Sequence, residues 1–254
     1  MSTKSQYEKV PMELKDQVLT YMLDCCLRTG VTRSAILKGA FSLKIALGNN
    51  PNVRRATSDL DFDILADIDP EWALTTVSNE ICKNPCFREI KRRINTSNPG
   101  MGLVFLVKWQ GEIFKTKIDF QRTLNDVSQP FRPNTVRGML ADKVKVNLTR
   151  TLERRAKDAY DLFIIDRYLV PIGTKMTDLL SLDDYRNYPP SECLYFSPDG
   201  LNRIQHAMNK YAPKPVLQGV TSIMQNNVTF LTALYNSLHG RYVYKGQMGD
   251  WRTT

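Results

Sequence analysis

The chain has 254 residues and 42% hydrophobic residues, and its 35 Lys and Arg against 26 Asp and Glu give a net charge of +9. This composition excludes a disordered chain, a collagen-like chain and a disulfide-rich miniprotein. The five cysteines are scattered and no Cys/His set has zinc-site spacing, so we expect reduced thiols in a cytoplasmic protein. No apolar run approaches the roughly 20 residues of a membrane span, which predicts a soluble protein with no membrane partner.

The N-terminal half is predicted to mix helices and strands, from apolar periods of 3.6 and 2 residues. In chain order we expect a helix (11–29), a short strand (35–37), a helix (39–47), a strand (59–65), a helix (70–83) and two strands (102–108 and 113–121) around a turn at Gln110-Gly111. The short spacing of the last two strands predicts an antiparallel hairpin.

The C-terminal half is predicted to be helical, after a proline-containing break near residue 130. The expected helices span 135–152, 154–169, 175–183, 199–211 and 216–238. The chain therefore divides into a mixed α/β half over residues 1–130 and a helical half over residues 131–254.

Three aspartates alternate along the strand predicted over residues 59–65. The sequence DLDFDIL puts its apolar side chains on one face and Asp59, Asp61 and Asp63 on the other. Carboxylates spaced this closely repel one another unless a cation lies between them, and Mg²⁺ prefers carboxylate oxygens. The pattern favours a metal site, and the alternative is a solvated acidic strand.

Asp119 offers a third carboxylate, on the strand predicted over residues 113–121. If that strand pairs beside residues 59–65, Asp119 joins Asp59 and Asp61, and the three could hold two metal ions for in-line phosphoryl transfer. Upstream, Gly39 follows Lys38 at a strand-to-helix junction, where backbone N–H groups can approach a phosphate. The alternative for Gly39 is an ordinary turn.

Positive charge is concentrated in residues 132–157, where eight basic residues stand against two acidic ones. Such a cluster suggests a polyanionic partner, either nucleotide phosphates or a nucleic-acid backbone. The alternative is a solvated helix face.

Four blocks, taken together in this order, are more specific than any one of them. They are ILKGAFSLKIAL, RRATSDLDFDI, KTKIDF and LADKVKVNLTRTLERRAKDAYDL. This arrangement over about residues 30–168 resembles the AbiEii/AbiGii-type nucleotidyltransferases, which include the MenT toxins and belong to the DNA polymerase β-like superfamily. The resemblance implies an α+β fold, with a nucleotidyltransferase core of mixed sheet over residues 1–130. A C-terminal helical bundle domain over residues 131–254 would contribute the motifs of Lys143 and Asp158.

The resemblance also implies roles for single residues. Asp59 and Asp61 correspond to the metal-binding pair, and Asp119 to the third carboxylate, which helps to activate the attacking hydroxyl. Lys143 corresponds to the lysine on the triphosphate, and Asp158 to the first Asp of the final acidic motif, in which the second, Asp161, has a structural role. For nucleotide binding the matching positions are Lys38, Gly39, Thr57 and Ser58, together with Lys143.

The first block departs from the family pattern of Lys-Gly-Gly-Thr. This chain has Gly39-Ala40-Phe41, so Phe41 removes a hydroxyl that Ser42 could replace after a shift of register. The departure affects the expected nucleotide binding more than the expected metal chemistry.

Three functions remain open from the sequence. The favoured one is a toxin that transfers NMP from an NTP to an RNA acceptor, with a tRNA 3′ end as the expected target, Mg²⁺ or Mn²⁺ as cofactor and a cognate antitoxin as partner. The second is a nucleotidyltransferase that places AMP on a protein hydroxyl. The third is an inactive nucleic-acid-binding module.

Overall fold

The computed structural model describes residues 10–48, 55–95, 100–128, 130–148, 156–171, 173–211, 219–238, 242–244 and 251–253. They belong to two compact units. The first unit comprises Met1–Ile45 and Ala56–Asn134, and the second comprises Ala46–Arg55 and Thr135–Thr254. The division of function near residue 130 stays a prediction.

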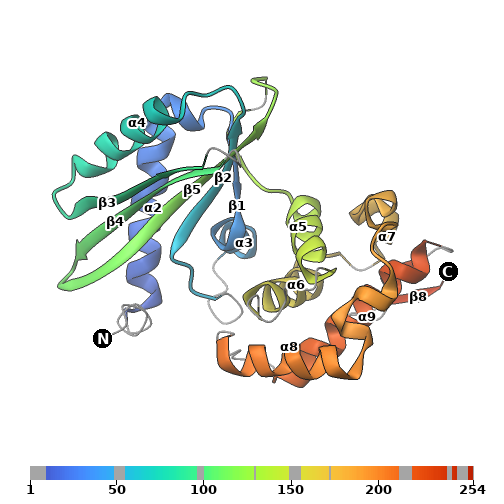
Figure 1. Ribbon diagram of the computed structural model, residues 1–254. Helices are drawn as coiled ribbons and strands as arrows, with labels where there is room; N and C mark the ends of the chain where they lie inside the picture. Colours follow the sequence, from blue (N-terminus) through green and yellow to red (C-terminus); the bar gives the residue numbers. More distant parts are fainter. Residues whose placement is uncertain are drawn as a thin grey trace. The chain divides into compact units, whose positions relative to one another are not determined.

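The first unit is built on a six-stranded mixed sheet with the strand order β3-β4-β5-β2-β1-β6 (Figure 1). Its strands are β1 (Ile36–Lys38), β2 (Asp59–Leu65), β3 (Phe87–Ile94), β4 (Gly100–Trp109), β5 (Glu112–Leu124) and β6 (Arg132–Pro133). β2 runs parallel to β5 and β1 runs parallel to β6, whereas the other neighbours are antiparallel. This order places β5 beside β2, which is the condition under which Asp119 was expected to join Asp59 and Asp61.

Two helices, α2 (Met12–Arg28) and α4 (Pro70–Cys82), supply the apolar cover of the sheet (Figure 1). Burial along β2 alternates, and Leu60, Phe62 and Ile64 are at most 1% exposed, so these side chains form the core with the two helices. The aspartates of the same strand lie on the opposite face because side chains alternate along a strand. Burial on one face thus leaves the carboxylates on the other.

The hairpin of β4 and β5 turns at Gln110 and Gly111, as predicted. Both residues have positive φ, 48° and 83°, which is typical of the two-residue turn that matches the twist of paired strands. Two strands were not predicted. β3 carries the sequence FREIKRRI, whose charges hide any alternation, and β6 is only two residues long and contains a proline.

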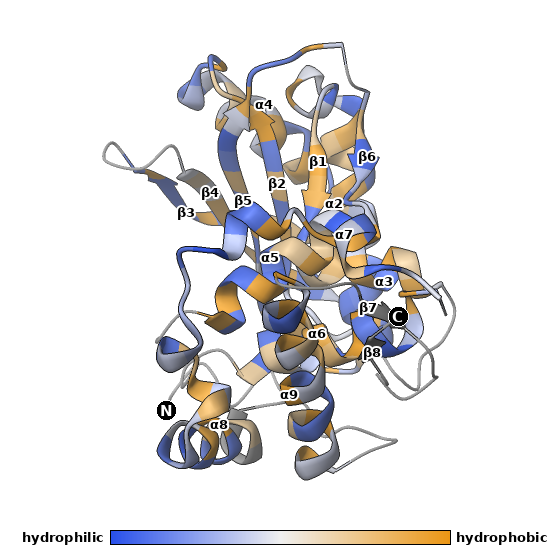
Figure 2. Ribbon diagram, turned by 90° about the vertical axis from the view of Figure 1, so that its right-hand side faces the viewer, coloured by the Kyte–Doolittle hydropathy of each residue, from blue (hydrophilic) through white to orange (hydrophobic). Residues whose placement is uncertain are grey.

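The second unit consists mainly of helices. Its α-helices are α5 (Val136–Leu148), α6 (Ala156–Tyr168), α7 (Met176–Leu179), α8 (Pro198–Tyr211) and α9 (Val220–Ser237). Hydrophobic and hydrophilic residues alternate along α8 and α9 (Figure 2), as expected for helices that bury one side. A two-stranded sheet of β7 (Tyr242–Tyr244) and β8 (Trp251–Thr253) was not predicted.

The helix expected over residues 175–183 is shorter in the structure. α7 ends at Leu179 because Leu180 and Ser181 are extended, and a 3₁₀ turn follows at Leu182–Tyr185. Residues 149–155, which the two preceding helices were expected to include, lie outside the described residues. They include three arginines of the basic stretch over residues 132–157.

In the described part of the chain, no helix combines the length and the apolar character that a membrane crossing requires.

Candidate active site on the open sheet face

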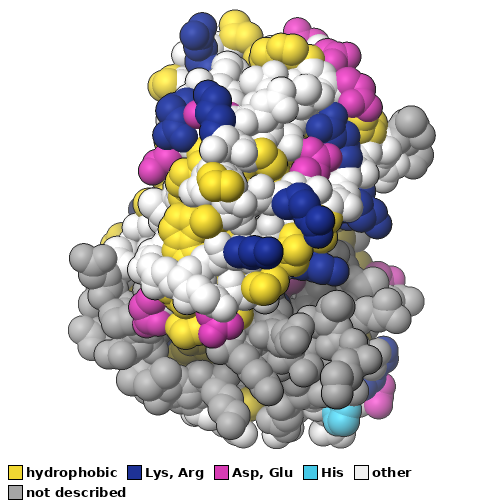
Figure 3. All heavy atoms as spheres, turned by 90° about the vertical axis from the view of Figure 1, so that its left-hand side faces the viewer, with side chains coloured by type: hydrophobic (Ala, Val, Ile, Leu, Met, Phe, Trp, Pro, Cys, Tyr) yellow, Lys and Arg dark blue, Asp and Glu magenta, His cyan; other side chains and the backbone are white. Residues whose placement is uncertain are grey.

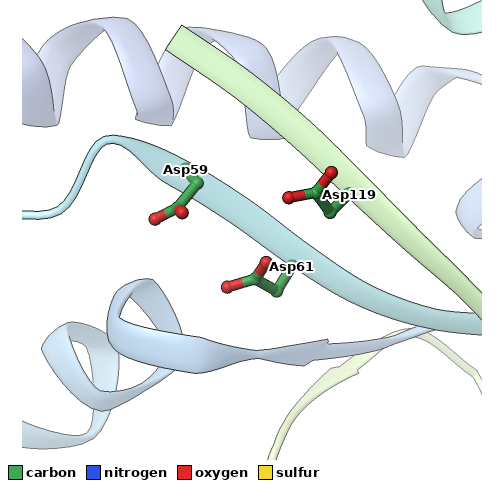
Figure 4. A group of neighbouring side chains, drawn as sticks. All are labelled: Asp59, Asp61 and Asp119. Atoms are coloured by element: carbon green, nitrogen blue, oxygen red, sulfur yellow. The ribbon is translucent and has the colours of Figure 1, made fainter. Parts of the chain in front are cut away.

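Three carboxylates lie together on the face of the sheet opposite α2 and α4 (Figure 4). Asp59 and Asp61 come from β2, and Asp119 comes from β5, directly opposite Asp61 in the register. One oxygen of each residue lies within 4.8 Å of the others, and all three side chains are partly exposed. We call these three residues the carboxylate cluster. The structure thereby confirms the predicted proximity of Asp119 to the alternating pair.

Two glycines leave room for the carboxylate cluster. Gly39 has a φ of +66°, and a Cβ built there would lie 2.2 Å from Oδ2 of Asp61. At Gly102 a Cβ would lie 2.7 Å from Oδ1 of Asp119. Both distances are shorter than any contact that a real side chain could keep. Gly39 therefore has a steric role beside Asp61, and its predicted role in phosphate binding stays a prediction.

Two basic side chains contact the carboxylate cluster. The ammonium of Lys117 lies 3.1 Å from Oδ2 of Asp59 and also pairs with Oδ2 of Asp119, while Arg93 pairs with Oδ1 of Asp119. Burial alone would lower the pKa of Lys117, but the charges of Asp59 and Asp119 outweigh burial and raise this pKa to about 12. Lys117 is therefore a permanent cation that offsets the like charges of the cluster.

Thr57 and Ser58 hold the start of β2 in place. The Thr57 hydroxyl donates a hydrogen bond of 2.7 Å to Oδ1 of Asp59. The Ser58 carbonyl accepts hydrogen bonds from the Lys117 N–H, at 3.3 Å, and from the Thr116 hydroxyl, at 2.9 Å. Thr57 thus orients the Asp59 carboxylate and Ser58 ties the start of β2 to β5, while their predicted contacts with a nucleotide stay predictions.

The first block of the resemblance is partly explained by packing. Phe41 is 3% exposed and belongs to the hydrophobic core, so the departure from the family pattern fills space inside the unit. Ser42 is fully buried and accepts a hydrogen bond of 3.0 Å from the backbone N–H of Asn134. Its hydroxyl is thus directed inward. The ammonium of Lys38 lies 3.0 Å from Asp63, which neutralises the remaining aspartate of β2.

The second unit contains a separate group of charges centred on Asp161. Lys143, on α5, lies 2.6 Å from Asp158 and 2.8 Å from Asp161, both on α6. Arg55 donates two hydrogen bonds to Asp161, of 2.6 and 2.7 Å. Asp161 is completely buried. We call these four residues the buried ion network.

The pKa values in this network are shifted by competing causes. Burial alone would raise the pKa of Asp161, but Lys143 and Arg55 outweigh it and hold that pKa well below its usual range. Burial alone would lower the pKa of Lys143, and the charges of Asp161 and Asp158 raise it instead. Asp161 and Lys143 are therefore charged at neutral pH, and each has an opposite charge in direct contact.

Hydrogen bonds extend the buried ion network across the second unit. The Asn147 side-chain amide donates to the Lys143 carbonyl at 2.8 Å, and its oxygen accepts from the Tyr195 hydroxyl, also at 2.8 Å. Asn227 on α9 donates to the same hydroxyl at 3.1 Å and to the Ala159 carbonyl at 2.9 Å. These bonds join α5, α6 and α9 through their buried sides.

Three basic residues at these sites received no role from the sequence. Lys117 shares the face of Asp119 by alternation, which was a usable signal. Arg55 stands two residues before Thr57, inside the second block of the resemblance, but only the fold shows that it pairs with Asp161. Arg93 lies on the strand that was not predicted, so no signal pointed to it.

The donor set of the carboxylate cluster fits a hard divalent cation. Oxygens of three carboxylates converge from two adjacent strands, and the glycines keep the space beside two of them open. Because Lys117 already contacts Asp59 and Asp119, a metal ion shared by these residues would have to displace its ammonium. The described residues hold no other group of three or more such side chains.

No protein-family model matches the chain, and no curated protein matches it in sequence. Among solved structures, the chain is similar to a candidate nucleotidyltransferase from H. pylori, with 14% identity, 88% of this chain and 94% of that chain covered, and a TM-score of 0.56. JHP933 from Helicobacter pylori gives 14% identity, coverages of 89% and 93%, and a TM-score of 0.52. MenT4, a nucleotidyltransferase toxin from Mycobacterium tuberculosis, gives 16% identity, coverages of 89% and 91%, and a TM-score of 0.39. The first two likenesses confirm the predicted nucleotidyltransferase fold.

Proposed function

We propose that this protein is a metal-dependent nucleotidyltransferase that transfers NMP from an NTP to an RNA acceptor. The observation that carries the proposal is the carboxylate cluster on the open face of a nucleotidyltransferase fold. The acceptor that we propose is a tRNA 3′ end, and the biological role is that of a toxin held in check by a cognate antitoxin. Both follow from the resemblance in sequence.

In this proposal the carboxylate cluster holds Mg²⁺ or Mn²⁺. The bound metal would neutralise the triphosphate and the developing charge on the leaving group. An acceptor hydroxyl attacks the α-phosphorus, the bond to the bridging oxygen breaks, and pyrophosphate leaves. Asp119 takes the proton of the hydroxyl, which requires Lys117 to release one of its oxygens.

The remaining residues support this chemistry. Thr57 holds Asp59 in its rotamer, and Gly39 keeps the space beside Asp61 open. Lys38 and Ser58 complete the proposed nucleotide site, Lys143 is proposed to bind the triphosphate, and Asp158 is proposed as a further residue that activity requires. Since Lys143 already pairs with two carboxylates, contact with a phosphate would replace its pair with the more exposed Asp158.

The test is label transfer from each NTP, with Mg²⁺, to total tRNA and to protein. We expect labelled RNA with the wild type and a loss of about 1,000-fold in Asp59→Asn, which keeps the shape of the side chain and removes its charge. Asp67→Asn is the matched control, because Asp67 is exposed in the turn after β2. Absence of labelled RNA with every NTP would sink the RNA acceptor, and label on protein would point to the AMP-transferring alternative.

A further inference from the structure

The carboxylate cluster occupies only one end of the sheet face that lies opposite α2 and α4. The pairing of β3, β4 and β5 arranges the side chains of this face in successive rows across the strands. At the cluster, Arg93 lies in the row of Asp119, and Lys91 and Lys117 lie in the row of Asp59, all on the same face. Further along, the rows contain Arg88 and Lys115, then Lys108 and Ile113.

Apart from Asp119 of the carboxylate cluster, β3, β4 and β5 carry basic and no acidic side chains on this face. We call this part of the face the basic sheet face, and its basic residues are Arg88, Lys91, Arg93, Lys108, Lys115 and Lys117. Figure 3 shows the side on which β3, β4 and β5 project, where Lys and Arg side chains lie beside hydrophobic ones and a few acidic ones. The charge of the face therefore changes from acidic at the cluster to basic toward the β4–β5 turn.

Four of these basic side chains are not neutralised by a described acidic residue. Arg88, Lys91, Lys108 and Lys115 are exposed, and none of them forms an ion pair with another described residue. By contrast, Arg92 on the other face of β3 pairs with Glu89 and Glu71. Unpaired charges gathered on one face create a positive potential that attracts a polyanion.

Protection of a sheet edge does not account for the whole pattern. Charges on an edge strand prevent pairing with another chain, and this could explain Arg88 and Lys91 on β3. Lys108 lies on β4, which has neighbours on both sides: its N–H donates to the Cys86 carbonyl, and the residue opposite it on β5 is Ile113. A charge at this position protects no edge.

Apolar side chains lie between the basic ones on the same face. Val104 and Leu106 on β4 are partly exposed, and Ile113 on β5 is 55% exposed. A single strand of nucleic acid offers phosphates to cations and the flat faces of its sugars and bases to apolar side chains. A face that interleaves both kinds of residue matches this alternation better than a uniformly charged one.

We propose that the basic sheet face binds the single-stranded 3′ segment of the acceptor RNA and leads its terminal hydroxyl to the carboxylate cluster. This inference rests on the proposed function, since it gives a path to the acceptor of that reaction. Ile113 is six residues from Asp119 along β5, which is about 20 Å, or roughly six stacked nucleotides. Charge complementarity selects the RNA as occupant.

The experiment measures binding of a short labelled single-stranded RNA by fluorescence anisotropy, without NTP, over a range of salt concentrations. The test variant is Lys91→Gln/Lys115→Gln. We expect its Kd to rise about tenfold and the slope of log K against log salt to fall by about 1.4, because two phosphate contacts are lost. The matched control is Arg28→Gln/Lys83→Gln, which removes two exposed charges from α2 and the end of α4, where both pair with Glu80.

The outcomes separate this inference from the proposed function. Wild-type affinity and salt slope in Lys91→Gln/Lys115→Gln would overturn the RNA path, as would a lack of RNA binding by the wild type or an equal loss in the control. Unchanged RNA binding by Lys91→Gln/Lys115→Gln would indicate that the basic sheet face binds an acidic protein partner instead. Asp59→Asn should bind RNA with wild-type affinity or better while losing transfer, so a failure of catalysis alone leaves the binding face intact.

Discussion

The carboxylate cluster and the buried ion network use the same residue types in opposite ways. The network, and the cluster together with its partners Lys117 and Arg93, each combine at least two aspartates with two basic side chains at ion-pair distance. In the cluster the partners are exposed to solvent, with Lys117 at 37% and Arg93 at 48%. In the network Asp161 is inaccessible, and Arg55 and Lys143 are only 11% and 13% exposed.

The difference in exposure decides what each group can do. An exposed ion pair contributes at most about 1 kcal/mol, so the cations at the carboxylate cluster can be exchanged for a ligand at low cost. A buried charge loses its hydration and depends on its partner, so the pairs that Asp161 forms with Arg55 and Lys143 resist exchange. The first arrangement suits binding and chemistry, and the second suits the fixing of α5 and α6 together.

The largest expected loss of stability follows from a substitution in the buried ion network. Asp161→Asn keeps the size of the side chain but leaves Arg55 and Lys143 with less compensating charge. We expect a loss of about 3–5 kcal/mol in the free energy of unfolding of the second unit. Urea unfolding measures the loss, and hydrogen exchange of the α6 amides locates it.

Asp59→Asn is the counterpart in the carboxylate cluster. It removes one of several like charges from a partly exposed position, so we expect unfolding within about 0.5 kcal/mol of the wild type. Equal destabilisation by the two substitutions would contradict the division into a binding group and a structural group.

Gly39→Ala tests whether the carboxylate cluster needs the empty space beside Asp61. The substitution costs about 1–2 kcal/mol from the positive φ, and the new methyl group also pushes Asp61 from its position. We therefore expect weaker Mn²⁺ binding, measured by electron paramagnetic resonance, together with the loss of stability.

Gly111→Ala separates the two causes. Gly111 also has a positive φ, of 83°, but a Cβ there meets nothing within 4 Å. We expect a similar loss of stability with unchanged Mn²⁺ binding. If Gly39→Ala binds Mn²⁺ as tightly as Gly111→Ala does, the steric role of Gly39 beside Asp61 is wrong.

The carboxylate cluster was predictable because one period of two residues governs both the sequence and the strand. Alternation placed Asp59 and Asp61 on one face, and the same rule placed Asp119 on its own strand. Their meeting depended on which strands pair, and the resemblance and the parallel register of β2 with β5 agree on it. Periodicity alone does not determine strand order.

The buried ion network was only half predictable. The sequence put Lys143 and Asp158 on successive helices, and the resemblance marked Asp161 as structural. The pairing of Arg55 with Asp161 joins residues 106 positions apart, which no local pattern encodes. Likewise, β3 was missed because its charges face two different environments, Arg92 toward α4 and Arg93 toward the carboxylate cluster.

A further expected effect concerns the stability of the protein in acid. The pKa of Asp161 is lowered in the folded protein, so its contribution to stability is present above the unfolded value, about 3.9, and is lost as the pH falls below it. The wild type should therefore lose up to about 1.4 kcal/mol per pH unit below pH 4 through this group. Asp161→Asn has no such group, so its free energy of unfolding should fall less steeply between pH 5 and 3, in buffers of the same ionic strength. Urea unfolding at each pH compares the two slopes. Parallel slopes would mean that Asp161 is as easily protonated as an exposed carboxyl, which its contacts with Lys143 and Arg55 argue against.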